Sequence, residues 1–317
     1  MIKDFITYIN EGLFDRNQSE FVIIKTDKGI EQVYIPKTKD DLYKYIELDI
    51  EQAKKDRTYP NVNLNNIDVS ELEDDELVGL FGYDINPDIS NWNIKYIPND
   101  FFEYNKQIKK IIIPNSVTSI GYSAFYECIN LESVTIPNSV ESIGNDAFNN
   151  CSNLTSITIP NSVKNIGNNA FRNCINLESV IIPDSVTRIG DYAFFDCKDL
   201  KSVTISNRVE TIGISAFYNC SSLEYVTIPN SIENIREYTF EGCTNLTHVT
   251  ILDGVKSIGD NAFWRCSKLS SVTIPNSVTN IGYRTFNNCK GLTSVTISKH
   301  CRIKTDSFPR DCKIIIK

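Results

Sequence analysis

The chain has 317 residues, of which 41% are apolar, and a formal net charge of −8. No apolar run approaches the roughly 18 residues that a membrane-spanning helix needs, so we expect no membrane insertion. The acidity is uneven, because residues 1–100 hold 21 acidic and 11 basic side chains, whereas residues 101–317 hold 19 and 21. The C-terminal part therefore lacks the basic stripe that binds phosphates, which argues against nucleic acid as a partner.

Residues 1–60 do not repeat, and their pattern predicts a small α+β region made of a helix, a hairpin and a second helix. Apolar residues at helical spacing predict helices over residues 3–14 and 38–56. Between them, the β-rich runs Phe21–Thr26 and Glu31–Ile35 flank a short turn containing Gly29, which favours a hairpin. The first stretch has acids among its apolar residues and no small-residue cleavage site, so it is not typical of a secretory signal. We expect a small domain or a cap over the first coil.

Residues 61–107 are predicted to form irregular capping coils, because the terminal repeats of a stacked array are usually atypical. The acids between Glu71 and Glu76 indicate the solvated start of a short helix. A calcium site is the alternative, although the spaced acidic loop that such a site uses is missing there.

Residues 108–317 repeat every 23 residues, as in Leu131–Asn153, LESVTIPNSVESIGNDAFNNCSN. The segment L-x-x-V-x-I predicts a strand with three inward side chains, and a proline often ends it. The segment V-x-x-I-G-x-x-A-F-x-x-C sets Phe and Cys three residues apart, which predicts a short helical or 3-10 turn. Nine copies in one register predict a solenoid whose coils bury their apolar residues against each other. Beyond Cys301 the register slips into a closing coil, with a last strand at Ile314–Ile316.

The cysteines follow the same period, which indicates a structural role. Nine of the ten are one repeat apart: Cys128, Cys151, Cys174, Cys197, Cys220, Cys243, Cys266, Cys289 and Cys312. At an inward position a free thiol behaves as a small apolar group, and close pairs such as C-x-x-C are absent. We therefore expect reduced, buried cysteines without metal. Cys301 is also expected to be buried, with a Cys301–Cys312 pair as the alternative.

The pattern L-x-x-V-x-I-P-x-x-V-x-x-I-G-x-x-A-F-x-x-C closely resembles the BspA-like leucine-rich repeats, over residues 92–317. The resemblance implies a mainly β solenoid with a parallel sheet on a concave face and turns on a convex face. It also implies adhesion and binding of host proteins, often at microbial cell surfaces. The absence of a visible secretion signal and the reduced cysteines instead favour a cytoplasmic or virion-associated location, with the cell surface as the alternative.

The first candidate binding site lies on the predicted concave face. Its outward positions are almost all Ser or Thr, which stabilise neighbouring strands. Ile181, Tyr225 and His248 are bulkier exceptions, and Tyr225 and His248 fall on adjacent coils. Aromatic side chains often dominate interfaces, so we expect a contact site centred on these two residues.

The second candidate site lies on the predicted convex edge. The residue after each core phenylalanine varies, and large aromatics cluster at Phe195, Tyr218 and Trp264, with Tyr192 nearby. An exposed aromatic patch would indicate a partner surface. The alternative is that these rings fold over the turns of adjacent coils. A further irregularity is Arg236, which replaces the repeat's glycine.

No catalytic constellation is visible, so the sequence predicts a chain that is not an enzyme and needs no cofactor. His248 and His300 are its only histidines, and neither accompanies a nucleophile motif, a P-loop or a dinucleotide fingerprint. The favoured function is a recognition module that binds a protein, with a glycan as a second ligand class. The alternative is a structural or assembly component docked through the N-terminal region. The oligomeric state stays open.

Overall fold

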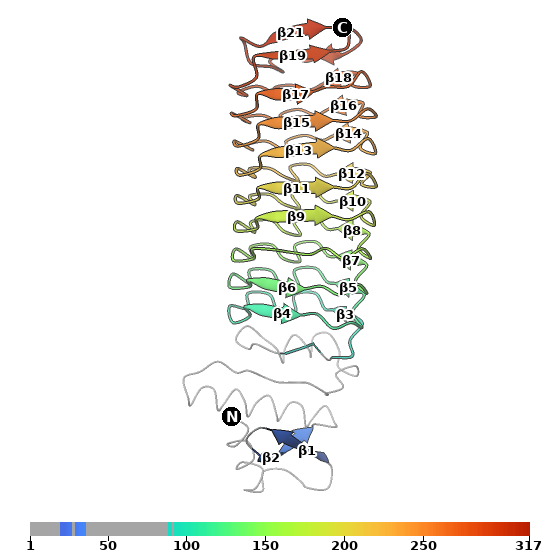
Figure 1. Ribbon diagram of the computed structural model, residues 1–317, viewed down its shortest axis with the longest axis vertical. Coiled ribbons are helices and arrows are strands. Elements are labelled where there is room, and N and C mark those ends of the chain that lie inside the picture. Colours follow the sequence, from blue (N-terminus) through green and yellow to red (C-terminus); the bar gives the residue numbers. More distant parts are fainter. Residues whose placement is uncertain (1–19, 27–28, 36–87, 91) are drawn as a thin grey trace.

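The computed structural model describes residues 20–26, 29–35, 88–90 and 92–317 (Figure 1). The predicted hairpin strands are confirmed as β1 (Glu20–Thr26) and β2 (Gly29–Ile35), which pair antiparallel with Thr26 opposite Gly29. The two predicted helices and the alternative calcium site lie outside the described residues. The division at residues 60 and 107 stays a prediction.

From residue 92 the chain forms a parallel β-solenoid whose coils stack into a column (Figure 1). Each regular coil contributes a longer strand, as predicted from L-x-x-V-x-I. These long strands are β4 (Lys110–Ile112), β6 (Ser133–Thr135), β9 (Ser179–Ile182), β11 (Ser202–Ile205), β13 (Tyr225–Ile228), β15 (His248–Ile251), β17 (Ser271–Thr273), β19 (Ser294–Ile297) and β21 (Lys313–Ile316). The coil between β6 and β9 has no such strand, and its Ser156 forms an isolated parallel bridge to Ser133 of β6.

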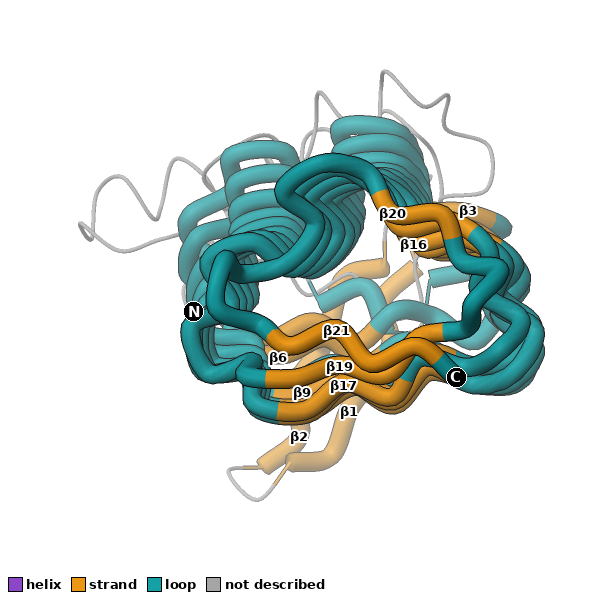
Figure 2. The backbone as a smooth tube through the Cα atoms, turned by 90° about the horizontal axis from the view of Figure 1, so that it is seen from above, coloured by secondary structure: helices purple, strands orange, loops and turns teal. Residues whose placement is uncertain are grey.

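A second parallel sheet, which the sequence pattern did not predict, runs along another side of the column. Its strands have two residues each and end on the isoleucine of the V-x-x-I segment. These short strands are β3 (Tyr96–Ile97), β5 (Ser119–Ile120), β7 (Ser142–Ile143), β8 (Asn165–Ile166), β10 (Arg188–Ile189), β12 (Thr211–Ile212), β14 (Asn234–Ile235), β16 (Ser257–Ile258), β18 (Asn280–Ile281) and β20 (Arg302–Ile303). Viewed along the column, the coils lie nearly above one another, with the two sets of strands on different sides (Figure 2). We therefore name the predicted concave face the long-strand face.

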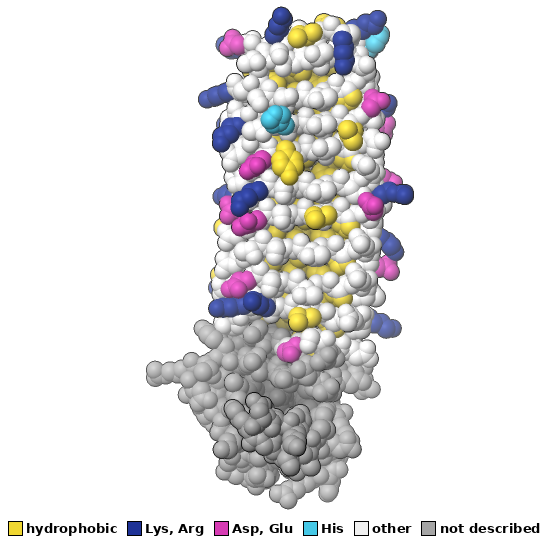
Figure 3. Space-filling view, in the orientation of Figure 1, with side chains coloured by type: hydrophobic (Ala, Val, Ile, Leu, Met, Phe, Trp, Pro, Cys, Tyr) yellow, Lys and Arg dark blue, Asp and Glu magenta, His cyan; other side chains and the backbone are white. Residues whose placement is uncertain are grey.

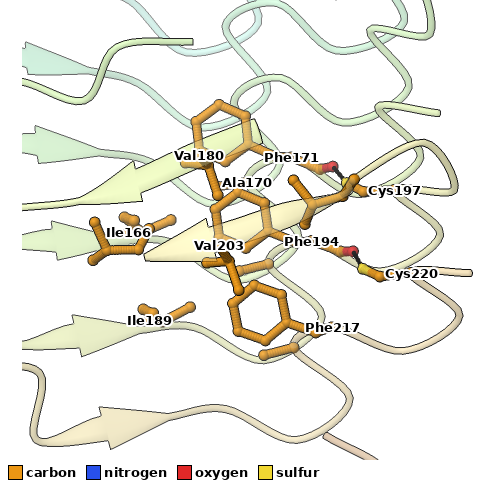
Figure 4. Close-up of a cluster of buried hydrophobic side chains, with 14 of the residues drawn as sticks. Ile166, Ala170, Phe171, Val180, Ile189, Phe194, Cys197, Val203, Phe217 and Cys220 are labelled. Carbon is orange, nitrogen blue, oxygen red and sulfur yellow. Dashed lines mark hydrogen bonds between the residues drawn. The ribbon is translucent and has the colours of Figure 1, made fainter. Parts of the chain in front are cut away.

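The core is a repeated set of inward side chains, as the pattern predicted. In one coil it comprises Leu131, Val134, Ile136, Val140, Ile143, Phe148 and Cys151, all buried. The phenylalanines form a continuous stack from Phe125 to Phe308, with successive ring centroids 5.0–5.4 Å apart. Figure 4 shows three of these rings, Phe171, Phe194 and Phe217, one above the other. Each coil thus depends on its neighbours for burial.

The predicted helical or 3-10 turns are wrong, because the described residues form no helix. The segment around Phe148 is a run of turns in which Asp146 and Asn150 have φ values of 56° and 62°. Residues in this left-handed region interrupt a right-handed helix. The amides of Asp146, Phe148 and Asn150 instead donate to carbonyls of the next coil, each at 2.8 Å. The turns therefore make a third ladder between coils, which we call the turn ladder.

The glycine that follows most of the short strands lets successive coils approach closely. A Cβ on Gly144 would lie 2.6 Å from the carbonyl carbon and oxygen of Gly121, and one on Gly167 would lie 2.5 Å from those of Gly144. A Cβ atom cannot lie that close to backbone atoms. Glycine is therefore needed here so that the backbones of successive coils can touch, and not because the position has an unusual φ. Arg236 takes this position once.

The end of the array departs from the prediction at its cysteines. The last strand is confirmed as β21, which pairs with β19. Cys301 and Cys312 were expected to be buried, but both are partly exposed. They lie in the last described coil, which has a neighbouring coil on one side only.

Candidate functional site

Between β6 and β19 the long-strand face is an uncharged surface bordered by charged side chains, whereas Lys110 and Lys313 occupy the same outward row on β4 and β21. Its outward residues are exposed or half-buried: Ser133, Thr135, Ser179, Ile181, Ser202, Thr204, Tyr225, Thr227, His248, Thr250, Ser271, Thr273, Ser294 and Thr296. Figure 3 shows this face, with most Lys, Arg, Asp and Glu side chains at its two borders. A border pair is Lys201 and Glu178, whose Nζ and Oε2 are 3.0 Å apart. This arrangement suits an interface, because charges are depleted at interface centres and tolerated at their rims.

Tyr225 and His248 come together as predicted. They lie directly opposite each other on the parallel strands β13 and β15, which places their backbones about 4.8 Å apart. Tyr225 is 56% exposed, and His248 is exposed with its Nδ1 2.9 Å from Thr247 Oγ1. Strand pairing therefore holds two large side chains side by side on a rigid backbone.

Ile181 does not join that pair. It is 68% exposed on β9, opposite Thr204 of β11, so it lies two strands from Tyr225 and in the other outward row. Sequence reasoning missed a similar residue, Ile112 on β4, which is 57% exposed and occupies the same repeat position as Ile181. The sequence could have indicated Ile112, because isoleucine replaces the repeat's outward threonine there as it does at Ile181.

The residues after the core phenylalanines form a row along the turns, in which Arg172, Phe195, Tyr218, Glu241 and Trp264 follow one another. We call it the turn-edge row. The guanidinium of Arg172 lies 4.7 Å from the Phe195 ring centroid, and Phe195 stacks on Tyr218 at 4.6 Å with an interplanar angle of 3°. The Arg265 guanidinium lies 4.0 Å from the Trp264 ring. These rings pack on each other and on cations rather than projecting outward.

Glu241 explains why the turn-edge row is a weaker candidate for binding. Its side chain is 4% exposed, and burial raises the pKa of its carboxyl, an effect that the hydrogen bond from Tyr218 and the charge of Arg265 oppose. Burial, followed by the nearby carboxylate of Glu241, raises the pKa of the Tyr218 phenol. Phe195, Tyr218 and Trp264 are half-buried, and only Tyr192, 37% exposed, projects further. This geometry supports the alternative in which the rings cover adjacent turns.

The cysteines occupy the core as predicted, except for the two in the last described coil. All ten are free, and the eight from Cys128 to Cys289 are buried. The Cys197 thiol donates to the Phe171 carbonyl at 3.1 Å, and Cys220 donates to Phe194 at 3.2 Å (Figure 4). Burial raises the pKa of these thiols well above its ordinary value. They serve packing and hydrogen bonding between coils.

We therefore expect alkylation of the native protein by iodoacetamide to modify Cys301 and Cys312 only. The thiolate is the reactive form, and burial both removes access and raises the pKa of buried thiols such as Cys174 and Cys197. Peptide mass spectrometry would locate the labels. A sample unfolded in urea, in which all ten cysteines should react, is the control. Labelling of any buried cysteine as fast as Cys312 would contradict the expectation.

Within residues 88–90 and 92–317 and the two N-terminal strands, no three His, Cys, Asp or Glu side chains gather as metal ligands would. Those residues also contain no helix with the length and apolar character that crossing a bilayer requires.

Stacked leucine-rich coils with parallel strands define a repeat solenoid, a class in which surfaces rather than enclosed pockets recognise partners. The sequence profile of the BspA type leucine rich repeat region, in six copies, matches residues 86–201 and 187–315. The chain belongs to this family, as its repeat pattern predicted, and the match indicates no enzyme family.

Solved structures of leucine-rich repeat proteins are similar to this chain. A leucine rich cell surface protein from Faecalibacterium prausnitzii is 27% identical, with a TM-score of 0.41, over 69% of this chain and 75% of that one. The T. pallidum leucine rich repeat protein is 24% identical, with a TM-score of 0.42, over 66% and 77%. A protein from Eubacterium ventriosum is 20% identical, with a TM-score of 0.48, over 92% of each chain. No curated protein matches.

Proposed function

We propose that the chain is a non-catalytic recognition module that binds a protein through the long-strand face. The observation that carries the proposal is the pairing of Tyr225 with His248 on adjacent strands, both exposed within an uncharged Ser and Thr surface. Most outward positions are taken by small hydroxyl residues that stabilise strand pairing. Tyr225 and His248 replace these small residues with large side chains that are exposed rather than buried in the core.

The chemistry of this pair suits a protein interface. Interfaces obtain most of their binding energy from a few aromatic or otherwise large side chains that are held in place before binding. The β-sheet backbone fixes Tyr225 and His248 without the ordering cost that a loop would add. Ile181 and Ile112 extend the exposed apolar area along the same face. A glycan that stacks on Tyr225 is the second ligand class consistent with these side chains.

The alternative function, an assembly component docked through residues 1–60, has no comparable support in the described residues, which include only β1 and β2 of that region. The turn-edge row is the alternative binding surface. Its rings are largely occupied by their neighbours, as in the Phe195 and Tyr218 stack. The long-strand face is therefore the favoured surface.

The test compares partner capture by the full chain and by a variant carrying Tyr225→Ala and His248→Ala. Proteins captured from the native environment by each bait would be identified by mass spectrometry, and the affinity of any partner then measured with purified components. We expect the double substitution to weaken binding by about 30-fold or more, because the loss of even one residue that dominates an interface costs about 2 kcal/mol.

Two control baits locate the effect. Thr135→Ala changes the same face far from the pair, and Tyr192→Ala changes the turn edge. Both are expected to bind like the wild-type chain. Unchanged affinity in the double variant would overturn the proposed site, and loss of binding only with Tyr192→Ala would favour the turn edge instead. Retention of every partner by a separate residues 1–60 fragment would support the assembly role.

A further inference from the structure

At one boundary in the middle of the array the short-strand sheet is interrupted and the long-strand sheet keeps a single residue pair, although the long-strand sheet also ends between β17 and β19. The short-strand sheet ends at β12 and begins again at β14, so it is divided into a six-stranded and a four-stranded part. At the same place, β11 and β13 pair only through Ser202 and Tyr225, whereas β13 and β15 pair at four positions. Figure 1 shows wider spacing between β12 and β14 and between β11 and β13 than between the strands on either side. We call this boundary, between residues 222 and 223, the joint.

Arg236 takes the place of the repeat's glycine at the joint. In regular coils the glycine at this position donates its amide to the preceding coil, as Gly213 does to Ile189 and Gly259 to Ile235, at 2.9 and 2.8 Å. A Cβ there would meet that coil's backbone at 2.4–2.8 Å. Arg236 has a Cβ at this position. Lys304 has one too in the last described coil, yet its amide still donates to Ile281 at 3.0 Å, so only at Arg236 is the sheet interrupted. Accordingly the amides of Glu233 and Arg236, both within the described residues, make no bond to the preceding coil.

A second substitution removes another link across the joint. The residue after the glycine is often Asn or Asp, and its side-chain oxygen accepts the amide of the next coil, as Asp191 Oδ1 does from Ile214 at 2.7 Å. Ile214 itself occupies this position before the joint and has no oxygen to offer. The amide of Glu237 therefore has no side-chain acceptor from Ile214. Two coils further on, the equivalent amide of Tyr283 donates to Asp260 Oδ1 at 2.7 Å.

The turn ladder, by contrast, crosses the joint unbroken. The amides of Ser215, Phe217 and Asn219 donate to the next coil at 3.1, 2.9 and 2.7 Å. The Phe217 and Phe240 rings stack at 5.3 Å, as elsewhere in the core. An ion pair from Arg236 Nη1 to Asp191 Oδ1, 3.2 Å apart, also crosses the joint and spans two coils. The boundary is therefore held at the turns, interrupted on the short-strand side and reduced to the Ser202–Tyr225 pair and the bond from Glu224 to Lys201 on the long-strand side.

We propose that the solenoid consists of two rigid blocks, residues 92–222 and 223–317, which flex about the turn ladder at the joint. Opening changes the distance between Ser202 and Tyr225 on the long-strand face, while Tyr225 and His248 keep their geometry because both belong to the second block. Arg236 acts twice: its Cβ prevents closure of the sheet, and its guanidinium limits opening through Asp191. The proposal does not depend on what the long-strand face binds.

Amide hydrogen exchange of the full chain tests the joint directly. In the wild-type protein, the amides of Glu233 and Arg236 are expected to exchange about tenfold faster or more than those of Glu210 and Gly213, their equivalents one coil earlier, after correction for intrinsic rates. Arg236→Gly removes the Cβ, so both amides should bond to the preceding coil and slow to the rates of those equivalents. Lys256→Gly, an exposed position one coil further on, is the matched control and should leave Glu233 unchanged.

Two further variants separate the steric and the ionic roles. Arg236→Ala keeps the Cβ and removes the charge, so exchange at residues 233 and 236 should stay fast or become faster. Asp191→Asn keeps the acceptor for Ile214 and removes the ion pair, with the same expected direction. Wild-type protection at residues 233 and 236 equal to that at 210 and 213 would overturn the joint. So would unchanged exchange in Arg236→Gly, or slow exchange in Arg236→Ala.

Discussion

Replacing Phe194 with alanine is expected to lower the free energy of unfolding by about 4 kcal/mol, because truncating a buried phenylalanine leaves a cavity that the surroundings fill only partly. Phe194 is fully buried and stacks on Phe171 and Phe217 at 5.2 Å on both sides. The substitution therefore interrupts the aromatic stack in the middle of the array. Urea unfolding followed by far-ultraviolet circular dichroism would measure the loss.

The adjacent residue provides a matched control. Phe195 has the same side chain but is half-buried in the turn-edge row, where it stacks on Tyr218. Phe195→Ala is expected to cost about 1 kcal/mol, as partly exposed aromatic pairs do. Equal losses from the two substitutions would show that the core stack is not what stabilises the coils.

Replacing Gly167 with alanine is expected to destabilise the protein by about 3 kcal/mol, the upper part of the range for overpacking a close contact. The added Cβ would lie 2.5 Å from the carbonyl carbon and oxygen of Gly144, and backbone cannot move away as a flexible side chain would. We expect the coils to separate locally, as they do at Arg236. Urea unfolding would give the loss in stability, and hydrogen exchange at Gly167 and Lys164 would show the separation.

Gly242→Asn is the control for this change. Gly242 has φ of 75° and lies in a row where Asn150, Asn173 and Asn219 occupy three of the other coils with similar φ values. A Cβ added at Gly242 would have Asn219 Oδ1, the end of a side chain, as its nearest atom at 3.2 Å. An asparagine there should change stability by less than about 0.5 kcal/mol. If Gly167→Ala lowered the free energy of unfolding by as little as Gly242→Asn, close approach of the two backbones would not explain the glycine at position 167.

The regular coils were predictable because their information is local and repeated. Alternation over L-x-x-V-x-I assigns inward and outward sides in each strand, and a period of 23 residues places equivalent positions above one another. The burial of Phe148 and Cys151, the family and the adjacency of Tyr225 and His248 all follow from this register. The same reasoning separated Ile181 from the Ser and Thr rows, although it overlooked Ile112.

The turns and the short strands were not predictable in the same way. A pair such as Ser142 and Ile143 is too short to show a period of two, so its strand exists only through pairing with Ser119 and Ile120. The spacing of Phe148 and Cys151 fits a helical turn, but the left-handed residues Asp146 and Asn150 direct the amides to the next coil. Bonds between coils, rather than bonds within them, decide the local conformation there.

The amino-acid order alone thus specifies which side chains face inward, how coils stack and where outward residues depart from the repeat, because these depend on periodicity. It marks Arg236 as an exception without revealing the consequence. Whether that exception interrupts the short-strand sheet depends on a separation of a few ångströms between coils, on the missing oxygen at Ile214 and on an ion pair with Asp191. Those distances arise only when the coils pack, and the packed array alone determines the joint.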